Sequence, residues 1–146
     1  MKENRNEIEI QASAEEVWNV LTDLKAYTEW NPFLYRAEGS VEAGEKVLLF
    51  SKTASNEMKF SCTVTNVDIN HEFSWRFHVG LPFLFRGEHT FRVEPLGEKS
   101  VRFIDREIFN GLLVPLQAKD LETNAKDGMI KMGEALKERI KDLQSS

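Results

Sequence analysis

Several features are absent from this sequence of 146 residues. It contains one cysteine, Cys62, which cannot form an internal disulfide and therefore fits a reducing compartment. No stretch approaches the roughly 18 consecutive apolar residues of a membrane span. The opening residues 1–5 are too polar for a secretory signal peptide. We therefore expect a cytoplasmic protein with no membrane span.

An excess of positive charge is also absent. The formal net charge is −5, and no stretch concentrates lysine or arginine. A nucleic-acid partner is therefore not expected, because it requires a basic surface. The three histidines lack metal-ligand spacing, and no nucleophile elbow, phosphate-binding glycine loop or dinucleotide fingerprint occurs. We accordingly expect no metal and no cofactor, and the oligomeric state stays open.

The composition is that of a globular protein. Hydrophobic residues account for 41% and charged residues for 29% of the chain, both ordinary values. This length is enough to bury a core without disulfides. We expect one domain over residues 1–146.

The first third predicts a strand and two short helices. Residues 7–11 alternate between polar and apolar, as in a half-buried strand. Ser13 and Glu16 have capping-box spacing at the start of a helix. Asp23 can cap a second short helix, which Pro32 ends because it disfavours helical geometry at Asn31.

Between about Tyr35 and Phe109 the hydrophobic period changes to two, which predicts strands. Short turn-forming segments separate them, so we expect an antiparallel meander. The predicted strands are Lys46–Phe50, Met58–Ile69, Glu72–Val79, Phe85–Glu94 and Val101–Phe109.

The last third predicts a helix from about Leu116 to Leu143. One apolar stripe runs along it: Leu121, Ala125, Met129, Met132, Leu136, Ile140 and Leu143. Gly128 and Gly133 flank this stripe. They either let the sheet approach closely or leave room for a ligand, so ordinary packing and a cavity both remain open.

This order of elements, together with several local segments, resembles the START-like (SRPBCC) superfamily and its bacterial polyketide cyclase/dehydrase-like group. The similar segments are Ile8–Trp18, Trp30–Phe33, Gly87–Phe91, Glu94–Gly97 and Arg106–Leu113. The resemblance implies an α+β helix-grip fold, a curved antiparallel sheet of six or seven strands around a long C-terminal helix. It also implies an apolar cavity between sheet and helix.

Alternation places long rows of aromatic side chains on the inner face of the sheet. Their combined apolar surface is larger than one helix can cover. A concave apolar site with a few polar groups is typical of a ligand pocket. The candidate ligand-binding residues are Trp75, Phe77, His89, Phe91, Phe103, Asp105, Glu107, Ala125 and Met129.

Three polar residues share this inner face, and they are the candidates for chemistry. A three-residue loop, Gly97–Lys99, places His89 opposite Glu107 in the last hairpin. A shift of two residues would place His89 opposite Asp105 and Arg92 opposite Arg102, an unfavourable pair. In both registers His89 faces a carboxylate, so His89, Glu107 and Asp105 either satisfy one another structurally or act as catalytic groups.

Three functions are consistent with the sequence. The first is a carrier or sensor that binds a hydrophobic small molecule, such as a lipid, a polyketide or an aromatic compound. The second is a polyketide cyclase/dehydrase-like enzyme in which His89 and Glu107 move a proton. The third is a protein-interaction module resembling the chaperone-ATPase activators of the superfamily.

Overall fold

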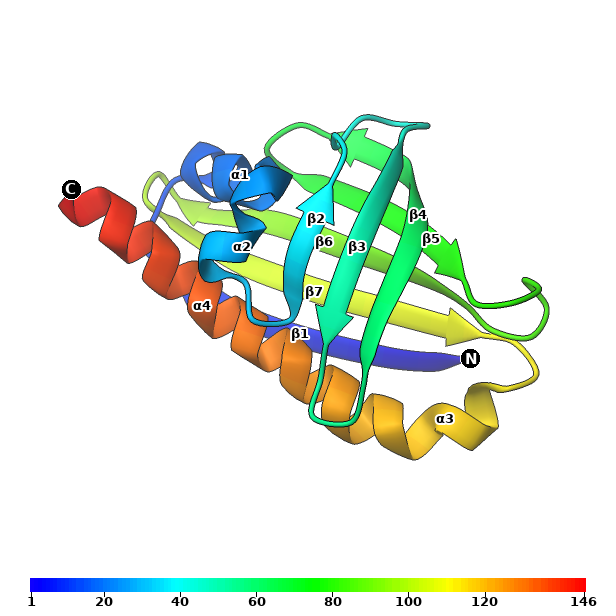
Figure 1. Cartoon of the computed structure of the whole chain (residues 1–146). Coiled ribbons are helices and arrows are strands. Elements are labelled where there is room, and N and C mark those ends of the chain that lie inside the picture. Colours follow the sequence, from blue (N-terminus) through cyan, green and yellow to red (C-terminus); the bar gives the residue numbers. More distant parts are fainter.

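The protein consists of a seven-stranded sheet, which is curled, and a long C-terminal helix that packs along it (Figure 1). The computed structural model describes residues 1–146. All strand pairs are antiparallel, in the order β1-β7-β6-β5-β4-β3-β2. The strands are β1 (Lys2–Ile10), β2 (Leu34–Glu38), β3 (Lys46–Lys52), β4 (Glu57–Asp68), β5 (Glu72–His78), β6 (Arg86–Gly97) and β7 (Ser100–Asn110). The predicted helix-grip fold is confirmed.

Strand β1 begins earlier than the alternation predicts, at Lys2 rather than at Glu7. Its polar first half still pairs with β7, from Lys2 opposite Phe109 onward. Backbone pairing needs no apolar side chains, so hydrophobic alternation detects only the half that contributes Ile8 and Ile10 to the inner face.

The predicted capping box starts helix α1 (Ala14–Thr22). The Glu16 N–H donates to Ser13 Oγ, and the Ser13 N–H donates to Glu16 Oε1, both at 3.1 Å. A 3₁₀ turn, η1 (Leu24–Ala26), and a short helix, α2 (Tyr27–Trp30), follow. The Asn31 side chain then accepts from the Phe33 and Leu34 N–H groups and turns the chain into β2.

The C-terminal helix runs continuously from Val114 to Ser145. It comprises α3 (Val114–Asp120), a π-helical turn η2 (Leu121–Ala125) and α4 (Lys126–Ser145). Most of the predicted stripe is buried, whereas Leu143 is half exposed in the last turn. None of the helices combines the length and the apolarity required to cross a bilayer.

The two helical glycines allow close approach and leave no room for a ligand. A Cβ on Gly128 would lie 2.5 Å from the Phe33 ring. A Cβ on Gly133 would lie 3.0 Å from the Asn6 amide of β1. Ordinary packing therefore applies at both positions.

Helices α1 and α2 cover one end of the inner face, and this end holds the main core (Figure 1). The Trp18 ring meets the Phe73 ring edge-on at 5.5 Å, and Tyr27 is fully buried, its hydroxyl donating to the Leu21 carbonyl. No helix of the N-terminal third covers the other end, where the sheet faces α3 and η2.

Candidate ligand-binding site

A cavity of about 280 Å³ lies between the sheet and the first half of the C-terminal helix. Fourteen of its 21 lining residues are hydrophobic, as in small-molecule sites. The lining comprises Phe33, Leu34, Leu49, Ser51, Thr53, Asn56, Met58, Phe60, Cys62, Trp75, Phe77, Val79, Phe85, His89, Glu107, Phe109, Leu113, Gln117, Asp120, Leu121 and Ala125.

Five of the nine predicted ligand-binding residues line this cavity: Trp75, Phe77, His89, Glu107 and Ala125. The other four, Phe91, Phe103, Asp105 and Met129, are fully buried and do not line it. Their placement corrects the expected lining. Helices α1 and α2 pack over this part of the inner face, so the free volume lies nearer α3.

Several lining residues were not predicted, mostly from β3, β4 and the segments that join elements. Phe33 and Leu34 follow the Asn31 turn, and Thr53 and Asn56 come from the β3–β4 loop. Alternation along the strands gave a usable signal for Leu49, Ser51, Phe60, Cys62 and Phe109, and the helical stripe gave one for Leu121, whereas no local pattern marks the loop residues as lining.

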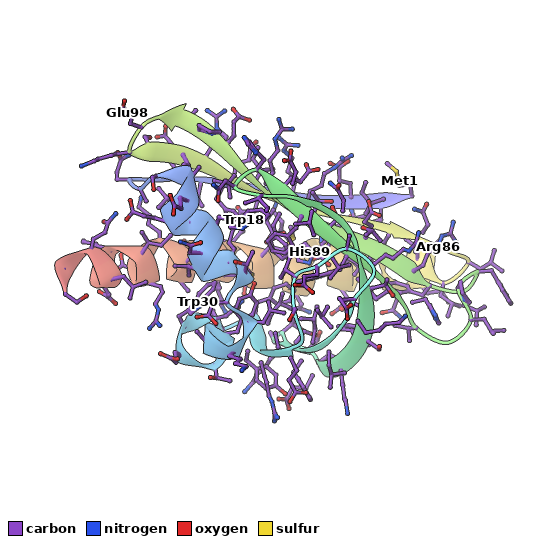
Figure 2. The ribbon with its side chains drawn as sticks, turned by 90° about the horizontal axis from the view of Figure 1, so that it is seen from above. Met1, Trp18, Trp30, Arg86, His89 and Glu98 are labelled. Atoms are coloured by element: carbon purple, nitrogen blue, oxygen red, sulfur yellow. The ribbon has the colours of Figure 1, made fainter.

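His89, Asp105 and Glu107 form a buried polar cluster, and two of them, His89 and Glu107, line the cavity (Figure 2 shows His89 inside the molecule). The backbone register places His89 opposite Glu107 and Glu94 opposite Arg102, as the three-residue loop predicts. The His89 Nε2 atom, however, hydrogen-bonds to Asp105 Oδ1, and its Nδ1 atom lies 3.7 Å from Glu107 Oε2.

Aromatic rings hold the imidazole of His89 in this position. It stacks on Phe91 with centroids 4.1 Å apart, and Trp75 meets it edge-on at 6.3 Å. His89 is 3% exposed, Asp105 0% and Glu107 6%. The charges of the cluster are therefore barely screened by water.

Burial and mutual attraction act in opposite directions on this cluster. Burial opposes the imidazolium, yet the carboxylates of Asp105 and Glu107 outweigh it and raise the pKa of His89. Burial raises the pKa of Glu107 to about 7, despite the attraction of His89. At neutral pH Glu107 is therefore present in both its protonated and its ionised form.

One oxygen of Glu107 has no partner. Glu107 Oε1 is fully buried without a hydrogen bond, as is Asp105 Oδ2, and Glu107 lines the cavity. Unsatisfied buried polar atoms are rare in native proteins. A protonated Glu107 can donate a hydrogen bond to a ligand oxygen, and an ionised one can accept a hydrogen bond.

The Cys62 thiol also borders the cavity, between apolar neighbours. Burial raises its pKa to about 12, and a thiol this basic is not an effective nucleophile at neutral pH. The structure contains no group of three or more His, Cys, Asp or Glu side chains arranged to hold a metal ion.

The π-helical turn η2 forms the wall opposite the cluster. Both Leu121 and Ala125 line the cavity. The Leu121 carbonyl accepts from the Lys126 N–H, five residues on, and from the buried Asn4 amide at 2.8 Å. Asn4 lies opposite Glu107 on the neighbouring strand. One side chain of β1 therefore bonds this turn to the sheet, beside the strand β7 that carries Asp105 and Glu107.

A hydrogen bond closes one side of the cavity entrance. Ser55, at the tip of the β3–β4 loop, donates to Asp120 Oδ1 at 2.6 Å, and Asn124 donates to the same oxygen. Both bonds lower the pKa of Asp120. Because Ser55 is exposed, water competes for this bond.

The fold and the internal cavity define a helix-grip protein of the START-like class. The chain belongs to the family described as polyketide cyclase / dehydrase and lipid transport, whose model matches residues 1–141. No curated protein matches its sequence.

Solved structures share the fold at low sequence identity. A START superfamily protein from Mycobacterium smegmatis is 21% identical, with a TM-score of 0.74, covering 97% of this chain and 98% of that one. The Zhui aromatase/cyclase from Streptomyces sp. R1128 is 17% identical, with a TM-score of 0.77 and coverage of 96% and 93%. Norcoclaurine synthase from Thalictrum flavum, in complex with dopamine and hydroxybenzaldehyde, is 18% identical, with a TM-score of 0.72 and coverage of 97% and 87%.

Proposed function

We propose that this protein binds a hydrophobic small molecule in the cavity between its sheet and C-terminal helix, as a carrier or sensor. The observation that carries the proposal is a largely apolar cavity of about 280 Å³ with one unpartnered buried carboxyl oxygen, Glu107 Oε1. An apolar cavity of about 150 Å³ already accommodates benzene, so a ligand of about two rings fits this volume.

The lining defines the chemistry of such a ligand. Its apolar body packs against Trp75, Phe77 and Phe60, and one polar atom reaches Glu107. Because a protonated Glu107 donates a hydrogen bond, a neutral carbonyl or hydroxyl oxygen is favoured there. A ligand carboxylate would bring another negative charge to Asp105 and Glu107 and is disfavoured.

Native mass spectrometry of the protein purified from cells tests the proposal first, because a retained ligand appears as added mass. Titration with the uncharged fluorescent probe N-phenyl-1-naphthylamine then measures the affinity of the cavity. Ala125→Leu places a larger side chain in the cavity, and we expect it to weaken probe binding at least about tenfold.

Ala135→Leu is the matched control. Ala135 is also partly buried on the C-terminal helix but does not line the cavity. Equal affinity in the wild type and Ala125→Leu, with no added mass in the spectrum, would refute the proposal.

An enzyme of the cyclase/dehydrase kind is the second candidate, favoured by the pKa of Glu107. A group with a pKa near 7 gives and takes a proton at neutral pH, as general acid–base catalysis requires. Glu107→Gln separates the two candidates. It keeps the shape of the side chain, so an enzyme would still bind its substrate but lose turnover.

A further inference from the structure

Exposed apolar side chains gather at one end of the molecule. Eleven large hydrophobic residues are exposed, and seven of them come from the N-terminus, the β5–β6 loop and the segment from β7 into α3. We call these seven residues the apolar tip: Met1, Val79, Leu81, Phe83, Leu112, Leu113 and Leu116. Figure 2 shows Met1 and Arg86 at this end and Glu98 at the opposite end.

Backbone contacts fasten the two loops of the apolar tip into one surface. The Leu112 N–H donates to the Phe83 carbonyl at 3.0 Å, and the Leu113 N–H donates to the Leu84 carbonyl at 2.9 Å. Gly111, at φ +127°, lies so close that a Cβ would be 2.4 Å from the Leu84 carbonyl oxygen. Four of the seven side chains are nevertheless 55% to 79% exposed, those of Leu81, Phe83 and Leu112 on these loops and that of Leu116 in α3.

The charge at this end is opposite to that of the whole chain. Residues 79–87 and 110–119 contain no Asp or Glu, although the protein has 24 acidic residues and a net charge of −5. Their two charged residues are cations, Arg86 and Lys119, both exposed. Arg86 donates only to the Pro82 carbonyl. Of the nearby acids, Glu122 pairs with Lys2, whereas Asp120, which accepts from Ser55, and the exposed Glu88 lie just beyond these two segments.

We propose that the apolar tip docks onto the surface of an anionic lipid bilayer. Exposed apolar side chains beside unpaired cations match the acyl–headgroup boundary of such a bilayer. A second copy of this chain fits less well, because a two-fold contact would bring the same cations together.

The apolar tip is continuous with the cavity. Val79 and Leu113 belong to both, so docking would bring the cavity lining next to the bilayer surface. The transfer of a ligand between bilayer and cavity rests on the proposed ligand binding, whereas the docking itself does not.

Co-sedimentation of the full chain with vesicles tests the docking. Two compositions are needed, phosphatidylcholine alone and an equimolar mixture of phosphatidylcholine and phosphatidylglycerol. The wild type is expected to bind the mixed vesicles more tightly. Leu112→Glu combined with Leu116→Glu should weaken this binding at least about tenfold, because both side chains would have to leave the bilayer. Arg86→Gln should weaken binding to the mixed vesicles by about fivefold and leave the neutral ones unaffected.

Ile69→Glu is the matched control, since Ile69 is 69% exposed at the other end of β5. It should bind vesicles as the wild type does, and circular dichroism should show that all variants fold. Three results would overturn the proposal: no sedimentation of the wild type, an equal loss in Ile69→Glu, or a stable dimer that the double variant dissociates. Probe binding measured without vesicles distinguishes a failure of docking from a failure of the cavity.

Discussion

The imidazole of His89 hydrogen-bonds to Asp105, diagonally across the β6–β7 ladder, and not to Glu107, which lies directly opposite. Its other nitrogen lies 3.7 Å from Glu107 Oε2. Asp105 therefore bonds to the histidine, whereas Glu107, which lines the cavity, has an oxygen without a hydrogen-bond partner.

Asp105→Asn should lower the pKa of His89 strongly, because burial still opposes the imidazolium after its closest carboxylate is gone. Glu107→Gln should lower this pKa less, since it removes only the more distant partner. Titration of the His89 ring protons by NMR measures both changes. Equal pKa values for His89 in the wild type and Asp105→Asn would contradict the assignment.

Glu107 should make the protein less stable as the pH rises. Its folded pKa, about 7, lies above the ordinary value of 4.5, so between these values the folded state binds more protons than the unfolded state. The contribution of Glu107 to the free energy of unfolding therefore falls across this window, by a total of about 3 kcal/mol. Urea unfolding at about pH 5 and about pH 8 measures the loss. Glu107→Gln should reduce it, and an undiminished loss in the variant would exclude Glu107 as its source.

Gly128→Ala should destabilise the protein by about 1–3 kcal/mol, although alanine favours helices. The new Cβ would lie 2.5 Å from the ring of Phe33, a buried side chain. Gly133→Ala is the control, because its Cβ would meet the end of the partly exposed Asn6 side chain at 3.0 Å, which can move aside. Thermal unfolding compares the two. A Gly128→Ala variant as stable as Gly133→Ala would show that the Phe33 contact is not tight.

Asn4→Asp should loosen the π-helical turn at Leu121–Ala125. The substitution keeps the size of the side chain but replaces its N–H donor, 2.8 Å from the Leu121 carbonyl, with a second acceptor oxygen. Hydrogen exchange of the amides in residues 121–126 should become faster, whereas the amides of α1 should be unchanged. Unaltered exchange in the turn would mean that the backbone alone maintains it.

Much of the fold could be predicted from the sequence, because the patterns that mark its helices and strands are local. The capping box at Ser13 and Glu16, the period of two in the strands and the helical stripe each depend on neighbouring residues. Even the β6–β7 register was predictable, because a short loop and the Glu94–Arg102 pair leave few alternatives.

The position of the cavity depended on contacts that no local pattern encodes. Phe91 and Phe103 share a face with Trp75 and Phe77, so alternation cannot separate core residues from cavity residues. The separation arises because α1 and α2 fold over one end of the sheet and bring Trp18 against Phe73.

The helices and strands, their order and the side chains that point inward follow from backbone periodicity and hydrophobic burial, which are properties of the amino-acid sequence. Which inward residues border free volume, and which carboxylate bonds to His89, is set by the packing of the folded chain. Both outcomes depend on side-chain packing: the imidazole of His89 stacks on Phe91, and Asp105 is the residue that faces Phe91 across the β6–β7 ladder.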